Sequence, residues 1–223
     1  MPFELGLKDD CPELIAQRAD ASLKVTGDFY DMFSSDIHEV ARLLALAFYS
    51  EQHVYVAGLG ISAHLAAIFA SRFMRTTDGR APLPVQVLSP SLWLEEDREN
   101  GTEFSEVFAR QIEAHCADGD VLVLITQDGM HPALQAACRA AREQNMFTIG
   151  LTGGDGGLLG QDDLLDMELR VPSIEEGLVH ELHMNLVCLL DDLVDYYLSG
   201  KPELVREMLQ AGASSLREDL DRA

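Results

Sequence analysis

Basic residues are scarce in this sequence. Sixteen Lys and Arg stand against thirty-eight Asp and Glu, which gives a formal net charge of -22 at pH 7. Such a charge repels polyanions, so we expect no direct binding to nucleic acid or to an anionic membrane. The acidic surface has two interpretations. It is an adaptation for solubility or salt, or it is a feature that attracts a basic protein partner.

Cysteine motifs and long apolar runs are also missing. The four cysteines, Cys11, Cys116, Cys138 and Cys188, show no CxxC or CxxH spacing, so the sequence implies neither a zinc site nor a disulfide framework. No stretch reaches the roughly 18 uncharged apolar residues of a membrane span. The N-terminus lacks the basic and apolar regions of a secretory signal. We therefore expect a cytoplasmic protein.

Several motifs that would identify a chemistry are absent too. The sequence has no GxGxxG, no Walker A motif, no nucleophile elbow and no Ser-His-Asp order. His180 and His183 in the segment HELH are three residues apart, whereas the HEXXH zinc motif needs four. We also find no acid–base pair that the sequence alone places together.

The clearest positive signal is a βαβ unit over residues 119–157. The apolar run Val121–Ile125 meets a polar turn at Thr126–His131, and a helical pattern follows. A second apolar run, Phe147–Leu151, ends in a glycine cluster. The polar turn lies at the carboxyl end of a strand, which is where open α/β sheets bind ligands.

Strands and helices alternate along the rest of the chain. This alternation predicts a parallel sheet that helices cover on both faces. A helix over residues 178–198 is apolar on nearly all sides, so we expect it to be central and buried. The other expected elements are strands at 54–57, 83–88 and 167–171, helices at 63–74, 104–115 and 202–222, and two helical pieces within 11–49 that Gly27 or Asp28 divides.

The two turns after the first and third expected strands differ in chemistry. Gly58 and Gly60 allow a tight turn with exposed N–H groups, and Ser62 adds a hydroxyl, although a plain strand–helix connection needs the same glycines. In the second turn Thr126 can donate to an anion, but Asp128 opposes one. We therefore predict weak phosphate binding, which Asp128→Ser would improve.

Together these segments resemble the sugar isomerase (SIS) fold, in the phosphoheptose isomerase branch that includes a protein associated with the replication initiator DnaA. The resemblance covers about residues 12–198. It is carried by GLGIS at 58–62, GDVLVLIT at 119–126, AAREQNMFTIGLTGGDGG at 140–157, LRVPS at 169–173 and HELHMNLVCLLDDLVD at 180–195.

The resemblance implies a three-layer α/β/α sandwich with a five-stranded parallel sheet. It also implies a homotetramer or dimer with active sites between subunits. Residues 1–50 would be helices of the oligomer core, 51–198 the SIS domain and 199–223 an amphipathic C-terminal helix. A sugar phosphate would be held by Gly58, Gly60, Ser62, Thr126, Gln127, Gly129, His131 and His180.

The catalytic positions of the family are altered here. Isomerases of this branch have a His and a Glu four residues apart on the helix after the first turn, where this chain has Ile68 and Arg72. They have a Gln and a His on the long helix, where this chain has His180 and Cys188. Ile68 cannot transfer a proton, and Arg72 is permanently charged. The resemblance therefore implies a protein without sedoheptulose-7-phosphate isomerase activity.

Three functions remain open on this basis. The first is a non-catalytic oligomer that acts by protein interaction, with a basic partner such as DnaA. The second is a binding protein for a sugar phosphate. The alternative is a phosphoheptose isomerase with a diverged site. We expect no cofactor in any of these cases.

A metal site is a separate hypothesis. The resemblance places His64, His131 and His180 near the family pocket, and two of these rings would have to reach one point about 2.0–2.1 Å from each nitrogen to bind zinc or nickel. The other interpretation, which we favour, is that they are separate polar side chains that line a cleft.

Overall fold

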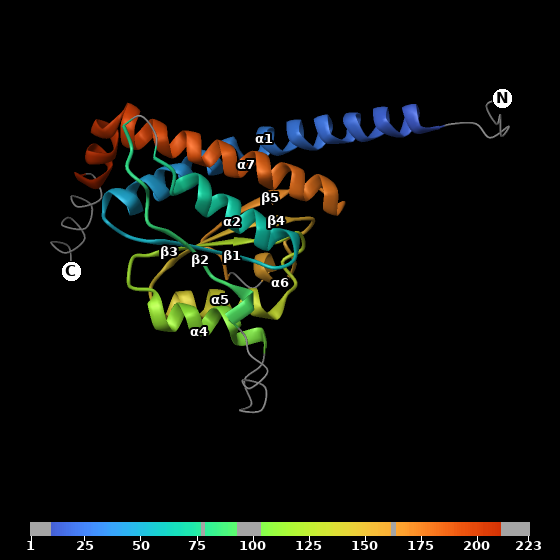
Figure 1. Cartoon of the computed structure of the whole chain (residues 1–223). Coiled ribbons are helices and arrows are strands. Elements are labelled where there is room, and N and C mark those ends of the chain that lie inside the picture. Colours follow the sequence, from blue (N-terminus) through green and yellow to red (C-terminus); the bar gives the residue numbers. More distant parts are fainter. Residues whose placement is uncertain (1–9, 77–78, 93–103, 162–163, 211–223) are drawn as a thin grey trace, which may run out of the picture.

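The computed structural model describes residues 10–76, 79–92, 104–161 and 164–210. Its helices and strands alternate along the chain, as the sequence predicts (Figure 1). In chain order they are α1 (Cys11–Tyr49), β1 (Val54–Gly58), α2 (Ile61–Phe73), β2 (Val85–Val87), η1 (Pro90–Leu92), η2 (Phe104–Glu106), α4 (Val107–His115), β3 (Val121–Ile125), α5 (Pro132–Glu143), β4 (Phe147–Gly153), α6 (Gly157–Gln161), β5 (Met167–Val171), α7 (Glu176–Asp195) and η3 (Tyr196–Gly200).

The five strands form one parallel sheet in the order β2-β1-β3-β4-β5. Every residue of β1 and of β3 is buried, because these central strands are covered on both faces. In the β1–β3 register Gly58 lies opposite Ile125, so the two strands end at the same level. The predicted α/β class and the five-stranded sheet are confirmed.

Helices cover the two faces of the sheet as separate layers (Figure 1). Val54 and Val56 of β1 pack with α1, α2 and α7 in one apolar cluster. Tyr55 and Ala57, which point to the other face, pack with α4 and α5 in a second cluster. The fold is therefore the three-layer α/β/α sandwich that the resemblance implies.

The expected division of the N-terminal region into two helices is wrong. α1 is one helix of 39 residues that passes through Gly27 and Asp28 without a break. A glycine inside a helix costs only about 1 kcal/mol, and Phe29, which follows, is fully buried in the core. The burial of the second half of α1 in the core therefore outweighs the small destabilisation of the helix by Gly27.

The first half of α1 extends beyond the body of the molecule (Figure 1). Its first buried residue is Phe29. Before that point the helix is attached to α7 through polar contacts, in which Arg18 pairs with Glu175 and Glu181 at 3.1 and 2.8 Å. The large apolar side chains of Leu14, Ile15 and Leu23 are exposed, whereas Val25 packs against the core cluster.

The long helix α7 packs against α1 and α2, but it is not surrounded as expected. Leu182, Leu186 and Leu190 are buried along one face, whereas Met184 is 37% exposed. The helix begins at Glu176, two residues earlier than predicted, and it ends in the single π-helical turn η3. Residues 202–210 are helical. The rest of the predicted terminal helix lies outside the described residues.

No helix in the described part of the chain is long and apolar enough to cross a membrane.

Candidate active site

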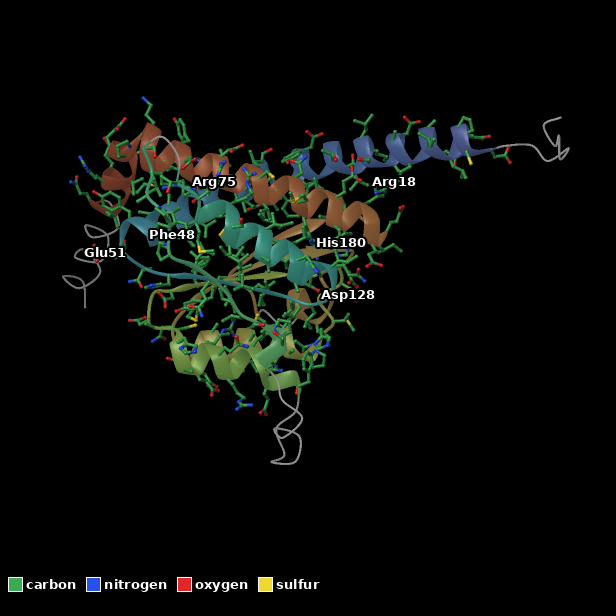
Figure 2. The ribbon with its side chains drawn as sticks, viewed as in Figure 1. Arg18, Phe48, Glu51, Arg75, Asp128 and His180 are labelled. Carbon is green, nitrogen blue, oxygen red and sulfur yellow. The ribbon has the colours of Figure 1, made fainter. Side chains whose placement is uncertain are left out.

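Two strand-end turns and the start of α7 enclose a cavity of about 460 Å³. Because β1 and β3 are neighbours, the turns that follow them meet at the carboxyl edge of the sheet, where the strand order reverses. Figure 2 shows His180 and Asp128 at this end of the molecule, far from Phe48 and Glu51 at the other end. The cavity is lined by Leu59, Gly60, Ile61, Ser62, Thr126, Gln127, Asp128, Met130, His131, Pro132, Leu134, Glu176 and His180.

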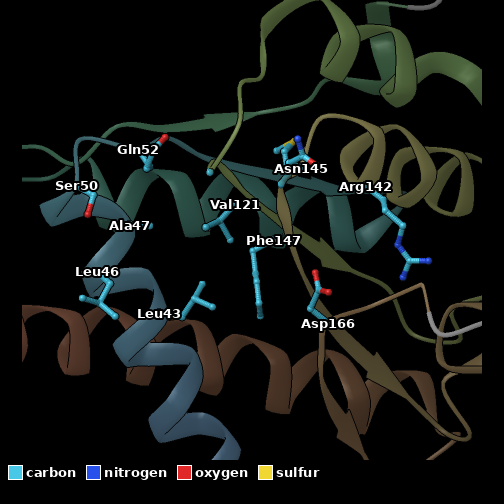
Figure 3. A pocket seen from close by; sticks show the side chains of 12 residues that line it. Leu43, Leu46, Ala47, Ser50, Gln52, Val121, Arg142, Asn145, Phe147 and Asp166 are labelled. Carbon is cyan, nitrogen blue, oxygen red and sulfur yellow. The ribbon is translucent and has the colours of Figure 1, made fainter. Parts of the chain in front are cut away.

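A second cavity, of about 580 Å³, lies at the opposite, amino-terminal edge of the sheet (Figure 3). The C-terminal end of α1 provides Leu43 and Leu46 to its wall, and β4 provides Phe147. Its ionic side chains are Arg142 and Asp166, and it contains no histidine. We assign the candidate active site to the smaller cavity, because that one holds the strand-end turns and a possible proton-transfer pair.

Glycine determines the path of the first turn. A Cβ atom on Gly58 would lie 2.5 Å from the Ser62 carbonyl oxygen, so no side chain fits there. Gly60 has a φ of 58°, in the left-handed region that favours glycine. This turn places Ser62 at the second position of α2, where it is 3% exposed and lines the cavity.

The second turn is held by hydrogen bonds from its own backbone. Asp128 accepts one from the Met130 N–H at 3.1 Å, and Thr126 accepts one from the Gly129 N–H at 3.2 Å. His131 caps α5, because its Nδ1 atom accepts from the Ala133 N–H at 3.1 Å. This bond assigns the ring proton of neutral His131 to Nε2, which leaves that atom as a donor.

The glycine cluster at residues 153–157 packs against the backbone of this second turn. A Cβ atom on Gly129 would overlap the carbonyl oxygen of Gly156, and one on Gly157 would overlap the carbonyl oxygen of Asp128. All three glycines have positive φ angles. The cluster is therefore needed for the close approach of two backbone segments.

His180 and Glu176 form the ionisable pair of the cavity. They lie one turn apart on α7, with His180 Nδ1 3.9 Å from Glu176 Oε1. The other ring nitrogen, Nε2, is 3.4 Å from the Ser62 hydroxyl. Burial lowers the pKa of His180, and the Glu176 carboxylate opposes this shift only in part. The imidazole is therefore neutral at pH 7 and can accept a proton.

The second histidine of the helix has a structural role. His183 is fully buried and its Nε2 lies 3.0 Å from the Thr152 carbonyl oxygen, to which it must donate. Burial lowers its pKa to about 4. His183 therefore stays neutral and ties α7 to β4.

The structure brings together most of the predicted ligand residues. Six of the eight line the cavity: Gly60, Ser62, Thr126, Gln127, His131 and His180. The other two, Gly58 and Gly129, are not among the lining residues, but they shape the turns. Asp128, which was expected to oppose an anion, also lines the cavity.

The three histidines of the metal hypothesis have separate partners. His64 is exposed and its Nδ1 lies 3.2 Å from the Gly60 carbonyl oxygen, whereas His131 caps α5 and His180 faces Ser62. Among the described residues, no group of three or more His, Cys, Asp or Glu is placed to hold a metal ion.

The remaining family positions lie away from the cavity. Ile68 packs against the main core cluster, and Cys188 is half-buried on α7. Arg72 binds the fully buried carboxylate of Asp191, which also accepts from Arg75 and Arg80. This ionic cluster links α2 to α7.

Sequence reasoning missed Glu176. It lies just before the stretch from which the long helix was predicted, so its position one turn before His180 was not considered. The spacing E-x-x-x-H was visible in the sequence as an i, i+4 pair.

Comparison with known proteins identifies relatives over most of the chain. The SIS domain family profile matches residues 20–153. The phosphoheptose isomerase of Halorhodospira halophila is 33% identical over 195 residues, which span 86% of this chain and 98% of that protein. The phosphoheptose isomerase of Nitratidesulfovibrio vulgaris is 31% identical over 196 residues, 86% of this chain and 92% of that protein.

Solved structures agree with these relatives. A phosphoheptose isomerase from Francisella tularensis superposes with a TM-score of 0.76 at 28% identity, over 83% of this chain and 98% of that one. The phosphoheptose isomerase of Neisseria gonorrhoeae has a TM-score of 0.74 at 26% identity over the same shares.

These relatives overturn the expectation of a non-catalytic interaction protein that binds DnaA. That expectation assumed that proton transfer could occur only at the family positions 68, 72, 180 and 188. The structure shows an ionisable pair, Glu176 and His180, at the cavity itself. The replacement of the family's catalytic residues therefore does not exclude isomerase chemistry.

Proposed function

The chain belongs to the SIS domain family, in its phosphoheptose isomerase branch, and from this we propose that it is a sugar-phosphate isomerase in which Glu176 and His180 transfer the protons. One observation carries the proposal. A carboxylate and a neutral imidazole, one helical turn apart, line the same cavity as the two strand-end turns.

The reaction needs two kinds of proton transfer. A base must remove a proton from the carbon beside the carbonyl group, and an acid must serve the carbonyl oxygen. Glu176 is 58% exposed in its side chain and suits the base. His180, neutral and with Nε2 toward Ser62, exchanges a proton with the substrate oxygen. In the family that the chain resembles, a His and a Glu four residues apart lie at the positions of Ile68 and Arg72 on α2. In this chain the same two residue types would act from α7.

The polar groups around the cavity suit a phosphate or several hydroxyls. Ser62 and Gln127 can donate, and His131 presents Nε2–H. The first turns of α2 and α5 both border the cavity, and the N-termini of helices attract anions. Asp128 opposes the anion, so we expect a low affinity for the phosphate.

We also propose a homo-oligomer, a dimer or a tetramer. The exposed half of α1 carries a set of large apolar side chains that a monomer leaves in water. In this proposal residues 1–50 belong to the oligomer core, as the sequence predicts. The exposed large apolar side chains of this first half are Leu14, Ile15 and Leu23, and those of the second half are Met32 and Tyr49.

The test is incubation with sedoheptulose 7-phosphate in deuterium oxide, followed by proton NMR. We expect the signal of the proton next to the carbonyl carbon to be lost as solvent deuterium enters, together with formation of the aldose phosphate. Glu176→Gln and His180→Gln should both abolish exchange, while His64→Gln, an exposed imidazole outside the cavity, should not change it. Exchange that persists in Glu176→Gln would reject the assignment of the base.

A further inference from the structure

We propose that Ser62 is also a nucleophile, and that Ser62, His180 and Glu176 together hydrolyse short-chain carboxylic esters of a sugar or similar polyol. This activity goes beyond isomerisation and does not depend on it. It rests on the relative placement of three side chains, which the sequence search for a Ser-His-Asp order could not detect, because two of them come from α7 and one from α2.

Ser62 and Glu176 face different nitrogens of the His180 ring. The Ser62 hydroxyl is 3.4 Å from Nε2 of His180, and Glu176 Oε1 is 3.9 Å from Nδ1 on the opposite side of the ring. A serine hydrolase needs this division of partners. One ring nitrogen must take the serine proton, while the other donates to an orienting carboxylate. Such contacts are often long before substrate binds, and they shorten in the complex.

The protonation state of the histidine is suitable. Burial lowers the pKa of His180 below its usual 6.5, and its side chain is 12% exposed. A neutral ring with its proton on Nδ1, toward Glu176, leaves the lone pair on Nε2 for the serine proton. The family resemblance places a glutamine at this position, which could not act as a base.

The position of the serine is also suitable. Ser62 is the second residue of α2, two residues after Gly60, whose φ is positive, and it lines the cavity at the N-terminus of that helix. Gln127 lines the cavity and carries an amide that can donate to the developing oxyanion. Leu59, Met130 and Leu134 give apolar surface for a short acyl chain.

The reaction balances without a cofactor. Ser62 Oγ attacks the ester carbonyl carbon, and His180 takes the serine proton. His180 then gives this proton to the departing alcohol as the ester bond breaks, which leaves an acyl-serine. A water molecule, deprotonated by His180, attacks the acyl carbon. The carboxylic acid leaves, and the proton returns to Ser62.

The cavity supports an acylated polyol as the substrate class. Its walls combine five apolar side chains with hydroxyl, amide, imidazole and carboxylate groups, which suits an ester group joined to a hydroxylated part. A volume of about 460 Å³ limits the ligand to a small molecule.

The experiment uses a fluorophosphonate probe, which modifies only activated serines, and p-nitrophenyl acetate as a model ester. We expect one probe molecule per chain, located on the peptide that contains Ser62 by mass spectrometry. Ser62→Ala should lose labelling, and His180→Gln should slow it by about a hundredfold or more. Ser50→Ala, which removes an exposed serine at the opposite edge of the sheet, and His64→Gln should label like the wild type.

Two outcomes would overturn the proposal. One is an unlabelled Ser62 in the folded wild-type protein. The other is labelling of Ser62 that His180→Gln leaves unchanged. Mapping the label on the wild type decides the matter even where Ser62→Ala fails to fold. Deuterium exchange into the sugar phosphate is measured separately, so a failure of ester hydrolysis is distinguishable from a failure of isomerisation.

Discussion

Arg72 lies 3.0 Å from the buried carboxylate of Asp191, which connects α2 to α7 at the position where the resemblance places a catalytic glutamate. Arg75 and Arg80 donate to the same carboxylate at 2.7 and 3.0 Å. The arginine therefore has a structural role in this chain. Proton transfer to or from a substrate must therefore use groups other than Arg72.

This ionic cluster predicts a large effect of removing its centre. Asp191→Asn removes the negative charge that the guanidinium groups of Arg72, Arg75 and Arg80 share. Breaking a buried ion pair in this way costs about 3–5 kcal/mol of stability. Asp192→Asn is the matched control, because that neighbouring side chain is 69% exposed and should change stability by less than about 1 kcal/mol. Urea unfolding followed by circular dichroism measures both. Equal effects of the two variants would contradict the structural role of Asp191.

Buried His183 predicts a stability that depends on pH. Its pKa is about 4 in the folded protein against 6.5 when exposed, so the unfolded chain binds the extra proton more readily. The contribution of neutral, buried His183 to the free energy of unfolding is complete above pH 6.5 and is lost as the pH falls from 6.5 towards 4. A shift of this size corresponds to about 3 kcal/mol. His183→Gln keeps a donor for the Thr152 carbonyl oxygen but cannot titrate.

The measurement is the free energy of unfolding at several pH values between 4 and 7 for both proteins. The wild type should lose more stability than His183→Gln across this window. Parallel curves would show that His183 is not the group responsible.

Asp128 predicts a gain of affinity on substitution. Its carboxylate lines the cavity and opposes a phosphate group, so Asp128→Ser should tighten binding of sedoheptulose 7-phosphate by about tenfold, or 1.4 kcal/mol. Serine can still accept from the Met130 N–H, which keeps the turn. Asp155→Ser is the control, because Asp155 makes the same kind of bond, to the Gly157 N–H, outside the cavity lining. Titration calorimetry compares the three proteins, and weaker binding by Asp128→Ser would show that the turn is misinterpreted.

The fold was largely predictable because its signals are local. Apolar runs such as Val121–Ile125 and the glycines at 58 and 60 identify strands and turns without any knowledge of distant contacts. The α1 helix was misjudged at Gly27 because the burial of Phe29, a tertiary effect, decided the outcome. A local rule cannot measure such burial.

The site was predictable only in part, for a related reason. Both turns follow neighbouring strands, so their meeting follows from the α/β pattern. The contact between Ser62 and His180 joins residues 118 positions apart and depends on how α2 and α7 pack. The family's catalytic positions correspond to Ile68, Arg72 and Cys188, which lie away from the cavity, and to His180, which lines it. That comparison predicted no catalytic residue and did not include Glu176, which also lines the cavity.

The exposed half of α1 predicts self-association. Leu14, Ile15 and Leu23 are 61%, 70% and 74% exposed, on a helix that extends beyond the body and is attached to α7 mainly by polar contacts. Burying such side chains between subunits contributes about 1.5–3 kcal/mol for each one. Light scattering at micromolar concentration should therefore give a dimer or tetramer for the wild type. Replacing Leu14, Ile15 and Leu23 together by Ser should shift it towards the monomer, whereas Ile174→Ser, which removes an exposed apolar side chain outside α1, should not. A monomeric wild type at this concentration would contradict the oligomer.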